Sequence, residues 1–291
     1  MDSESLRIFC AVAAELSITN AAARLGRVPS NVTTRIQQLE ADLGVALFAR
    51  TGKRIALSGA GERFHDYATR MLALEDEARQ AVTGGRDGGS LRIGSMESTA
   101  ASRLPAVLAR YHAQHAATRL TLQTGPSRQL VEQVRTGHLD CAFAALPPAP
   151  DGHDELAEMG LQARAIWTEE LLLLLPAGTP DTQAARDVRP RSLAAFPPGC
   201  TYRSAAERWL GIAGSGDWQI QEMGSYHAMI ACVAAGASVT VLPASVLQLS
   251  PAAGALPAIA LGPLDTCLVW RQGYDVPAFQ NLTAQLWPAG A

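Results

Sequence analysis

Apolar residues recur at helical spacing through the first 43 residues of the chain. The pattern predicts an amphipathic helix over 5–16, a short alanine-rich helix over 17–25 and a third helix over 29–43. The third helix carries an apolar stripe made of Val32, Ile36, Leu39 and Leu43. Three short helices of this kind predict a small domain with its own core.

Start and stop signals mark the second and third helices. A hydroxyl at Ser17 or Thr19 suits a helix N-cap, and Gly26 suits the left-handed residue that ends a helix. Pro29 is tolerated in the first turn of the third helix, because its missing N–H has no helical partner there. Two helices joined by so tight a turn predict a DNA-reading helix-turn-helix.

Polar side chains gather in the first half of the third helix, which is the part that enters the major groove in such motifs. Asn and Gln suit adenine, Arg suits guanine, and Ser or Thr suit bases or phosphates. The residues expected to contact DNA are Ser30, Asn31, Thr33, Thr34, Arg35 and Gln38. The alternative is an ordinary solvated helix face.

Two short apolar runs flank a basic turn in residues 47–57, which predicts a β-hairpin wing. Its cations, Arg50, Lys53 and Arg54, are expected to lie against phosphates or a minor groove. A merely solvated turn is the alternative.

A long amphipathic helix is predicted over 60–82, with an apolar stripe of Phe64, Tyr67, Met71, Leu74, Ala78 and Ala81. Pairing with a second copy is the simplest way to bury such a stripe. The Gly-rich segment 83–90 then predicts a hinge and a domain boundary.

Short apolar runs alternate with helical stretches after the hinge, which predicts a parallel α/β sheet. Strands are expected over 91–96, 120–125 and 139–146, and a second set of strands and helices follows, with strands at 170–175, 218–223 and 239–243. A return strand over 264–271 and a closing helix over 278–287 complete two lobes joined by crossing strands.

Ligands of such sheets bind beside the carboxyl ends of strands and the first turns of helices. The polar residues at these places are Glu97, Ser98, Thr99, Ser127, Arg128, Thr201, Tyr202, Arg203, Ser225 and His227. Arg203 has the geometry to bind a carboxylate through two parallel hydrogen bonds, so an anionic effector is expected. The alternatives are ordinary N-caps for the hydroxyls, a salt bridge for Arg203 and a structural role for His227.

Charge and cysteine content change this picture little. The 291 residues carry a net charge of -3, and residues 1–57 hold seven Lys and Arg against five Asp and Glu. The five cysteines have no CxxC spacing, and neither they nor the dispersed histidines predict a metal site or a disulfide framework. The N-terminus has no signal-peptide pattern and no apolar run reaches membrane length, so a cytoplasmic protein without membrane contact is expected.

Four motifs in register, AAARL, PSNVTTRIQQLEADLG, LFART and LSGAG, resemble the winged helix-turn-helix of LysR-type transcriptional regulators. Thr33 and Ser58 stand where the family usually has serine and threonine, which bears on the operator sequence rather than the fold. The segments GSLRIGS, GPSRQLVEQVRTGHLDCAF and SYHAMIACVAAGASVTVLP extend the resemblance over the whole chain.

The resemblance implies an N-terminal α-rich winged helix-turn-helix (1–59), a linker and dimerisation helix with its hinge (60–89), and a bilobed α/β domain like periplasmic binding proteins (90–291). Lobe I would hold about 90–163 and 266–291, and lobe II about 164–265. The implied partners are promoter DNA, a small-molecule effector, further copies in a homodimer or homotetramer, and RNA polymerase.

Other function classes fit the sequence less well. No nucleophile elbow, phosphate loop, HExxH or paired carboxylates indicate an enzyme, and no catalytic residue or cofactor is expected. A transport binding protein would need a signal peptide and no DNA-binding head. A redox-sensing regulator is the remaining alternative, in which Arg203 lowers the pKa of Cys200.

Overall fold

The computed structural model describes residues 1–51, 54–84, 88–146, 151–180, 184–212, 216–250 and 253–287. Contacts divide the chain into two units. Unit 1 comprises 1–84 together with 136–138, and unit 2 comprises 85–135 and 139–291.

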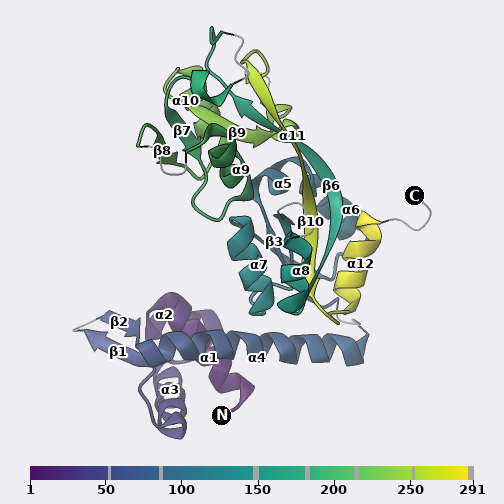
Figure 1. Ribbon diagram of the computed structural model, residues 1–291. Coiled ribbons are helices and arrows are strands. Elements are labelled where there is room, and N and C mark those ends of the chain that lie inside the picture. Colours follow the sequence, from purple (N-terminus) through teal and green to yellow (C-terminus); the bar gives the residue numbers. More distant parts are fainter. Residues whose placement is uncertain are drawn as a thin grey trace. The chain divides into compact units, whose positions relative to one another are not determined.

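Three helices form the head of unit 1: α1 (Ser3–Glu15), α2 (Ile18–Leu25) and α3 (Pro29–Leu43) (Figure 1). The Ser17 hydroxyl caps α2 by accepting from the Asn20 N–H at 3.3 Å, and Gly26 ends it with φ of 63°. Pro29 occupies the first turn of α3. These capping predictions are confirmed.

The wing is a two-stranded antiparallel hairpin of β1 (Phe48–Thr51) and β2 (Arg54–Leu57), in which Phe48 pairs with Leu57. The Glu40 carboxylate of α3 accepts from the N–H groups of Leu47 at 2.7 Å and Phe48 at 3.1 Å. One side chain therefore fixes the start of the wing to the third helix. The hairpin prediction is confirmed.

The long helix α4 (Gly59–Thr83) begins at Ser58, whose hydroxyl accepts from the Gly61 N–H at 3.0 Å. A Cβ at Gly61 would overlap the Leu47 carbonyl oxygen. Only glycine allows this close approach, so the LSGAG motif holds α4 against the base of the wing.

The predicted apolar stripe of α4 divides between two roles. The Phe64 ring lies 5.1 Å from that of Phe9 and packs against the core of the head. Farther along, Tyr67, Met71 and Leu74 stay exposed, with Leu74 64% accessible in the single chain. This exposed stripe is the surface that a second copy could cover.

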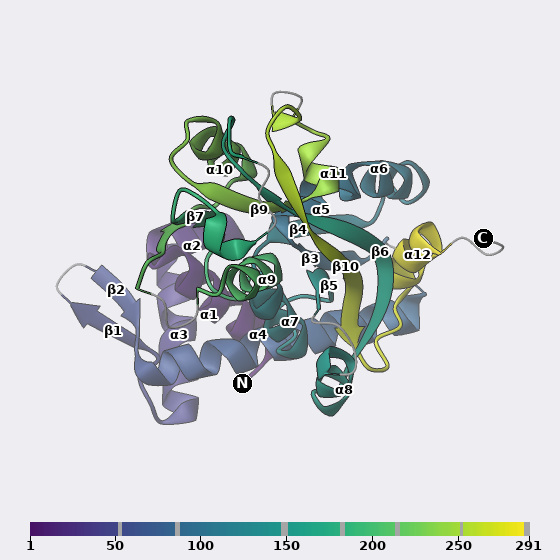
Figure 2. The ribbon, with the colours of Figure 1, turned by 45° about the horizontal axis from the view of Figure 1, so that its top comes forward.

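Unit 2 contains one mixed eight-stranded sheet in the order β4-β3-β5-β10-β6-β9-β7-β8 (Figure 2). The strands are β3 (Ser90–Ser95), β4 (Arg119–Thr124), β5 (Cys141–Ala145), β6 (Leu161–Leu174), β7 (Ser192–Ala195), β8 (Gln219–Glu222), β9 (Val239–Pro243) and β10 (Ala258–Arg271). The long antiparallel pair β6 and β10 crosses between two lobes. Parallel pairing holds within each lobe, as predicted, but the crossing strands make the whole sheet mixed.

Helices cover both faces of this sheet. They are α5 (Glu97–Ser102), α6 (Leu104–Gln114), α7 (Ser127–Arg135), α8 (Asp151–Glu158), α9 (Thr201–Leu210), α10 (Tyr226–Ala234), α11 (Ala244–Leu247) and α12 (Pro277–Leu286), with a 3-10 turn at Ala185–Asp187. Along β5, Phe143 packs in the cluster that contains α6 and α12, and Ala144 in the cluster that contains α7 and α9. We call the half with β3–β5 lobe I and the half with β7–β9 lobe II.

Several elements were not predicted. The first half of β6 carries polar residues such as Gln162 and Arg164, so only its apolar end at 170–175 was recognised as a strand. Helix α8, helix α11 and strand β7 are short, and β7 consists of Ser, Leu and two Ala, which are weak strand signals. In the described residues, no helix is both long enough and apolar enough to cross a membrane.

Candidate functional site

The first half of α3 presents its polar residues to solvent, as a DNA-reading helix must. Ser30, Asn31, Thr34 and Gln38 are exposed, and Thr33 and Arg35 are half-buried. Of the predicted apolar stripe, Val32, Ile36 and Leu39 are buried, and Leu43 at the end of the helix is exposed. The hydroxyls of Thr33 and Thr34 donate to carbonyls one turn earlier, Pro29 and Ser30, at 3.0 Å. Each hydroxyl oxygen keeps acceptor capacity toward a base or a sugar.

The cations of α3 and of the turn before it have acidic partners in the free chain. Arg35 lies 3.7 Å from Asp2, a loose and exposed ion pair. Arg27, in the turn before α3, pairs with Glu4 and donates to the Asn31 side chain at 3.2 Å. Exposed pairs of this kind contribute little to stability and exchange readily for a phosphate. Arg27 was missed by the sequence analysis, although a basic residue in this turn was a visible signal.

The wing cations fall at the edge of the described chain. Arg50 and Arg54 lie in β1 and β2, but their side chains are outside the described residues. Lys53 is also outside the described residues. Their role in binding DNA stays a prediction.

A cavity of about 210 Å³ lies between the lobes of unit 2. It is lined by Met96, Glu97, Ser98, Thr124, Gly125, Pro126, Ser127, Phe196, Pro197, Cys200, Tyr202, Gly224 and Tyr226. Four of the predicted cleft residues, Glu97, Ser98, Ser127 and Tyr202, are among them. The other lining residues were not predicted; most of them are apolar, proline or glycine positions, which carry no chemical signal in the sequence.

The cavity contains polar atoms without good partners. Glu97 Oε2 and Ser98 Oγ are buried and have no hydrogen-bond partner among the described residues. Burial raises the pKa of Glu97, against an opposing effect of His227. Burial also raises the pKa of Tyr202 to about 12, so its phenol is neutral and able to donate. Buried polar atoms without a hydrogen-bond partner favour a ligand that forms hydrogen bonds with them.

A second cavity of about 730 Å³ is lined by α7, α8, α9 and the end of β5, and it shares Ser127 with the first. Arg128 and Thr201 line this second cavity rather than the first. The Arg128 N–H donates to the Gly199 carbonyl at 3.2 Å, and the Thr201 hydroxyl donates to the Ala145 carbonyl at 2.7 Å. These two hydrogen bonds join lobe I to lobe II.

Arg203, which was predicted to bind an effector carboxylate, is engaged by acidic groups of its own lobe in this structure. Its side chain is only 12% exposed and pairs with Glu207 at 2.7 Å and Glu222 at 2.9 Å. It also donates to the Phe196 carbonyl at 3.0 Å. Arg203 is therefore the salt bridge that the sequence left as an alternative, and it does not line the first cavity.

The remaining predicted cleft residues lie around the first cavity without lining it. Thr99 is buried in α5, and Ser225 is the N-cap of α10. His227 is exposed on α10, close enough to Glu97 to influence its pKa.

Family models and relatives agree with this architecture. Residues 3–62 match the model for the bacterial regulatory helix-turn-helix protein, lysR family, and residues 84–290 match the LysR substrate binding domain. The chain belongs to the LysR family. It is a LysR-type DNA-binding transcriptional regulator with an effector-binding domain.

Two relatives from Bacillus subtilis (strain 168) illustrate the similarity. The chain is 38% identical to the HTH-type transcriptional regulator YusT, which is described as uncharacterized, over 88% of this chain and 83% of that protein. It is 35% identical to the HTH-type transcriptional regulator GltR, over 85% and 81% respectively. Both homologues are named as transcriptional regulators.

Solved full-length LysR regulators share the fold. CbnR matches with a TM-score of 0.67 and 24% identity over 98% of both chains. A variant of full-length OxyR from Pseudomonas aeruginosa matches with a TM-score of 0.70 and 20% identity, over 98% of this chain and 97% of that one. CbnR has also been solved in complex with its target DNA.

Thiol chemistry does not support the redox-sensing alternative within this LysR-type fold. Burial raises the pKa of Cys200, and the N–H groups of Arg203 and Tyr202 oppose that effect only in part. The predicted lowering of the Cys200 pKa is therefore wrong. Burial also raises the pKa of Cys10, of Cys141 and, to about 11, of Cys267. A protonated thiol is a poor nucleophile toward an oxidant.

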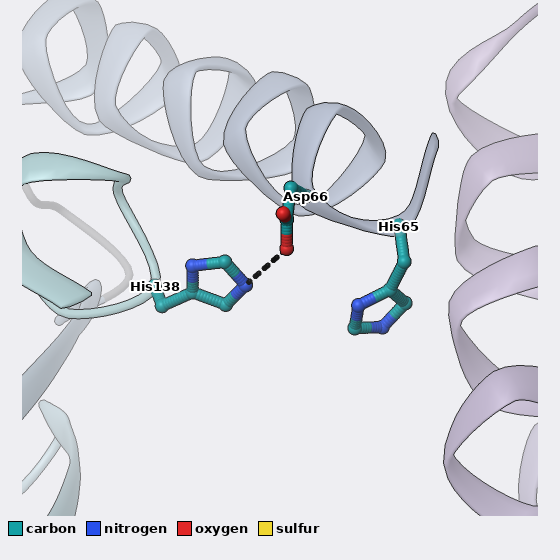
Figure 3. Close-up of side chains that lie close together, drawn as sticks. All are labelled: His65, Asp66 and His138. Atoms are coloured by element: carbon teal, nitrogen blue, oxygen red, sulfur yellow. Dashed lines mark ion pairs between the residues drawn. The ribbon is translucent and has the colours of Figure 1, made fainter. Parts of the chain in front are cut away.

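Two histidines and a carboxylate lie together in unit 1 (Figure 3). His138 Nε2 is 3.8 Å from Asp66 Oδ1, and the ligand atoms of His65, Asp66 and His138 all lie within 4.8 Å of one another. The sequence did not predict this grouping, because His138 is far from the other two along the chain. Asp66 is exposed, and exposed groups of this kind are common without a metal, so the grouping has no part in the function proposed below.

Proposed function

We propose that α3 and the wing read promoter DNA in this LysR regulator. The observation that carries this proposal is the exposed polar half of α3 above a buried apolar stripe, held to the wing by Glu40. The side chains of Asn31, Arg35 and Gln38 supply donors and acceptors to the base edges. The hydroxyls of Ser30, Thr33 and Thr34 contact bases or phosphates. Arg27, Arg50, Lys53 and Arg54 neutralise phosphates beside them.

Dimerisation through α4 is the second part of the proposal. The head has few net charges, and a single copy would bind DNA weakly, since phosphate contacts supply much of the affinity. Tyr67, Met71 and Leu74 form an exposed stripe along one side of α4, and burying it against a second copy joins two heads. Pairs of dimers then occupy a dyad-symmetric site as a homotetramer.

Ligand control of the DNA-bound state is the third part. A small-molecule effector in the first cavity touches residues of both lobes, so it stabilises the closed arrangement that the Thr201–Ala145 and Arg128–Gly199 hydrogen bonds hold. A ligand that prefers one lobe arrangement shifts the population toward it. The shift changes the bending of promoter DNA and the access of RNA polymerase.

A footprinting experiment tests the proposed function. The purified full-length chain is titrated onto fragments covering the promoters near its gene, with Gln38→Ala as the altered reader and Gln37→Ala, on the same helix, as its control. We expect saturable protection that Gln38→Ala weakens selectively. Equal protection of all fragments by every variant would contradict the proposed reading surface.

A further inference from the structure

The first cavity contains one carboxyl group and, among the described residues that line it, no Lys or Arg. Glu97 follows β3 and begins α5, and its Oε2 atom is buried without a hydrogen-bond partner. A carboxylate is an acceptor only, so any group that satisfies it must donate. The cavity therefore has the wrong charge for an anion.

The arginine that was expected to bind a carboxylate does not correct this charge. Arg203 follows Tyr202 in the chain, but Glu207 and Glu222 both pair with its guanidinium, and the Phe196 carbonyl accepts a further hydrogen bond. One cation with two carboxylate partners offers no net positive charge to a ligand.

Helix N-termini often bind anions through free N–H groups. At the start of α7, which begins at the cavity, one such group is already occupied. The Arg128 N–H of α7 donates to the Gly199 carbonyl at 3.2 Å.

Apolar side chains form much of the remaining cavity wall. Met96, Phe196, Pro197 and Tyr226 line it, and the Phe196 and Tyr226 rings meet edge to face at 4.9 Å between centroids. Such walls suit a compact hydrocarbon or aromatic body. The Ser98 hydroxyl, buried beside Glu97, offers one more acceptor or donor.

We propose that the effector of this regulator is a small amine with an apolar body, which binds in the first cavity and donates a charge-assisted hydrogen bond to Glu97. This inference rests on the proposed function, because it names the ligand class of the same cleft. Burial makes an ionised Glu97 unfavourable without a partner, and an ammonium group supplies that partner. The expectation of an anionic effector is thereby replaced.

The test compares matched probes on the full-length protein. Benzylamine, benzyl alcohol and benzoate share a ring and differ in the polar group, and n-butylamine, n-butanol and butyrate form an aliphatic set. Binding is measured by calorimetry and by the shift in melting temperature, for the wild type, for Glu97→Gln and for the exposed control Glu158→Gln.

We expect the amine of at least one set to bind roughly tenfold or more tightly than its alcohol and its carboxylate, since hydrogen bonds to charged groups are the stronger ones. Glu97→Gln should remove that preference, and Glu158→Gln should keep it. A carboxylate that binds as well as its amine, an amine preference that survives in Glu97→Gln, or no amine binding in either set would overturn the inference.

Footprinting of the same preparations separates this inference from the proposed function. Specific protection of promoter DNA together with preferred carboxylate binding refutes only the amine assignment. Loss of specific protection refutes the proposed function, whichever probe binds.

Discussion

Arg203 Nη1 donates to Glu222 Oε1 at 2.9 Å, which ties the first turn of α9 to β8 inside lobe II. Glu207 accepts from Nε of the same guanidinium at 2.7 Å. Arg203, whose position in the sequence suits a ligand carboxylate, thus pairs with two carboxylates of its own chain. This relationship changes both the role of Arg203 and the charge expected of the effector.

Arg203→Ala should destabilise the folded chain. The change leaves Glu207 and Glu222 without their cation, but both are partly exposed, so we expect a loss of about 1–2 kcal/mol. Such a loss lowers the melting temperature by about 2–8 °C for a domain of this size. Arg208→Ala, an exposed arginine of the same helix, is the control in a calorimetric or fluorescence melt. An unchanged melting temperature in Arg203→Ala would contradict the structural role.

Arg35→Ala should weaken promoter binding and relax base preference. Loss of one base-reading arginine costs about 1–3 kcal/mol of discrimination, which corresponds to roughly 5- to 150-fold in affinity. Titration of labelled promoter fragments at fixed salt measures this effect, and circular dichroism checks that the head remains folded. An affinity and a base preference equal to those of the wild type would remove Arg35 from the reading surface.

Leu74→Glu should prevent pairing of the linker helices. Leu74 is 64% exposed in the single chain, so the substitution leaves the fold of the chain intact while placing a charge in the proposed dimer contact. Sedimentation equilibrium should show a shift toward monomer, and DNA affinity should fall because the two heads are no longer joined. Glu62→Gln, on the first turn of α4, is the control. A Leu74→Glu protein that sediments as the wild type would place the dimer contact elsewhere.

Glu97→Gln should raise the stability of the unliganded protein at neutral pH. Burial raises the pKa of Glu97 in the folded chain, so the folded state holds this proton more tightly than the unfolded state does. The resulting stabilisation is present at low pH and is lost as the pH rises through the folded pKa. His227 opposes the shift, and Tyr226, whose own pKa burial raises well above 10, stays neutral nearby.

Melting curves between about pH 4.5 and about pH 7.5 check the sign of this effect. The melting temperature of Glu97→Gln should exceed that of the wild type by an amount that grows toward neutral pH. A difference that shrinks as the pH rises would show that the Glu97 pKa is lowered, and Glu158→Gln should show no such trend.

Much of the head was predictable because its signals are local. Ser17, Gly26 and Pro29 mark helix ends through their own backbone chemistry, and the stripe of α3 follows from its period. The wing followed from two apolar runs around a Gly-containing turn. Sequence alone did not show that Phe64 packs on the head while Tyr67 stays exposed, because both residues fit one helical stripe.

The cleft was predictable only in part, because its geometry depends on contacts between residues far apart in the chain. Placing candidates at strand ends found Glu97, Ser98, Ser127 and Tyr202 in one cavity. It did not find the partners of Arg203: Glu207 lies one turn along the same helix, but Glu222 lies on β8, and no local pattern indicates that second pair. Polar strand segments such as the first half of β6 were missed for a related reason: their pairing with β10 is set by the sheet and not by local hydrophobicity.

This LysR regulator is proposed to read a specific promoter sequence through α3, and the extent of the DNA it protects is proposed to change when a ligand fills the first cavity. The most direct measurement is footprinting of the full-length protein on its promoter fragment, with excess competitor DNA, with and without the amine that binds best. We predict protection over two half-sites related by a dyad, with an amine-dependent change in its extent that is absent in Glu97→Gln. Protection that competitor DNA removes entirely, or a pattern unaffected by any bound ligand, would contradict the account.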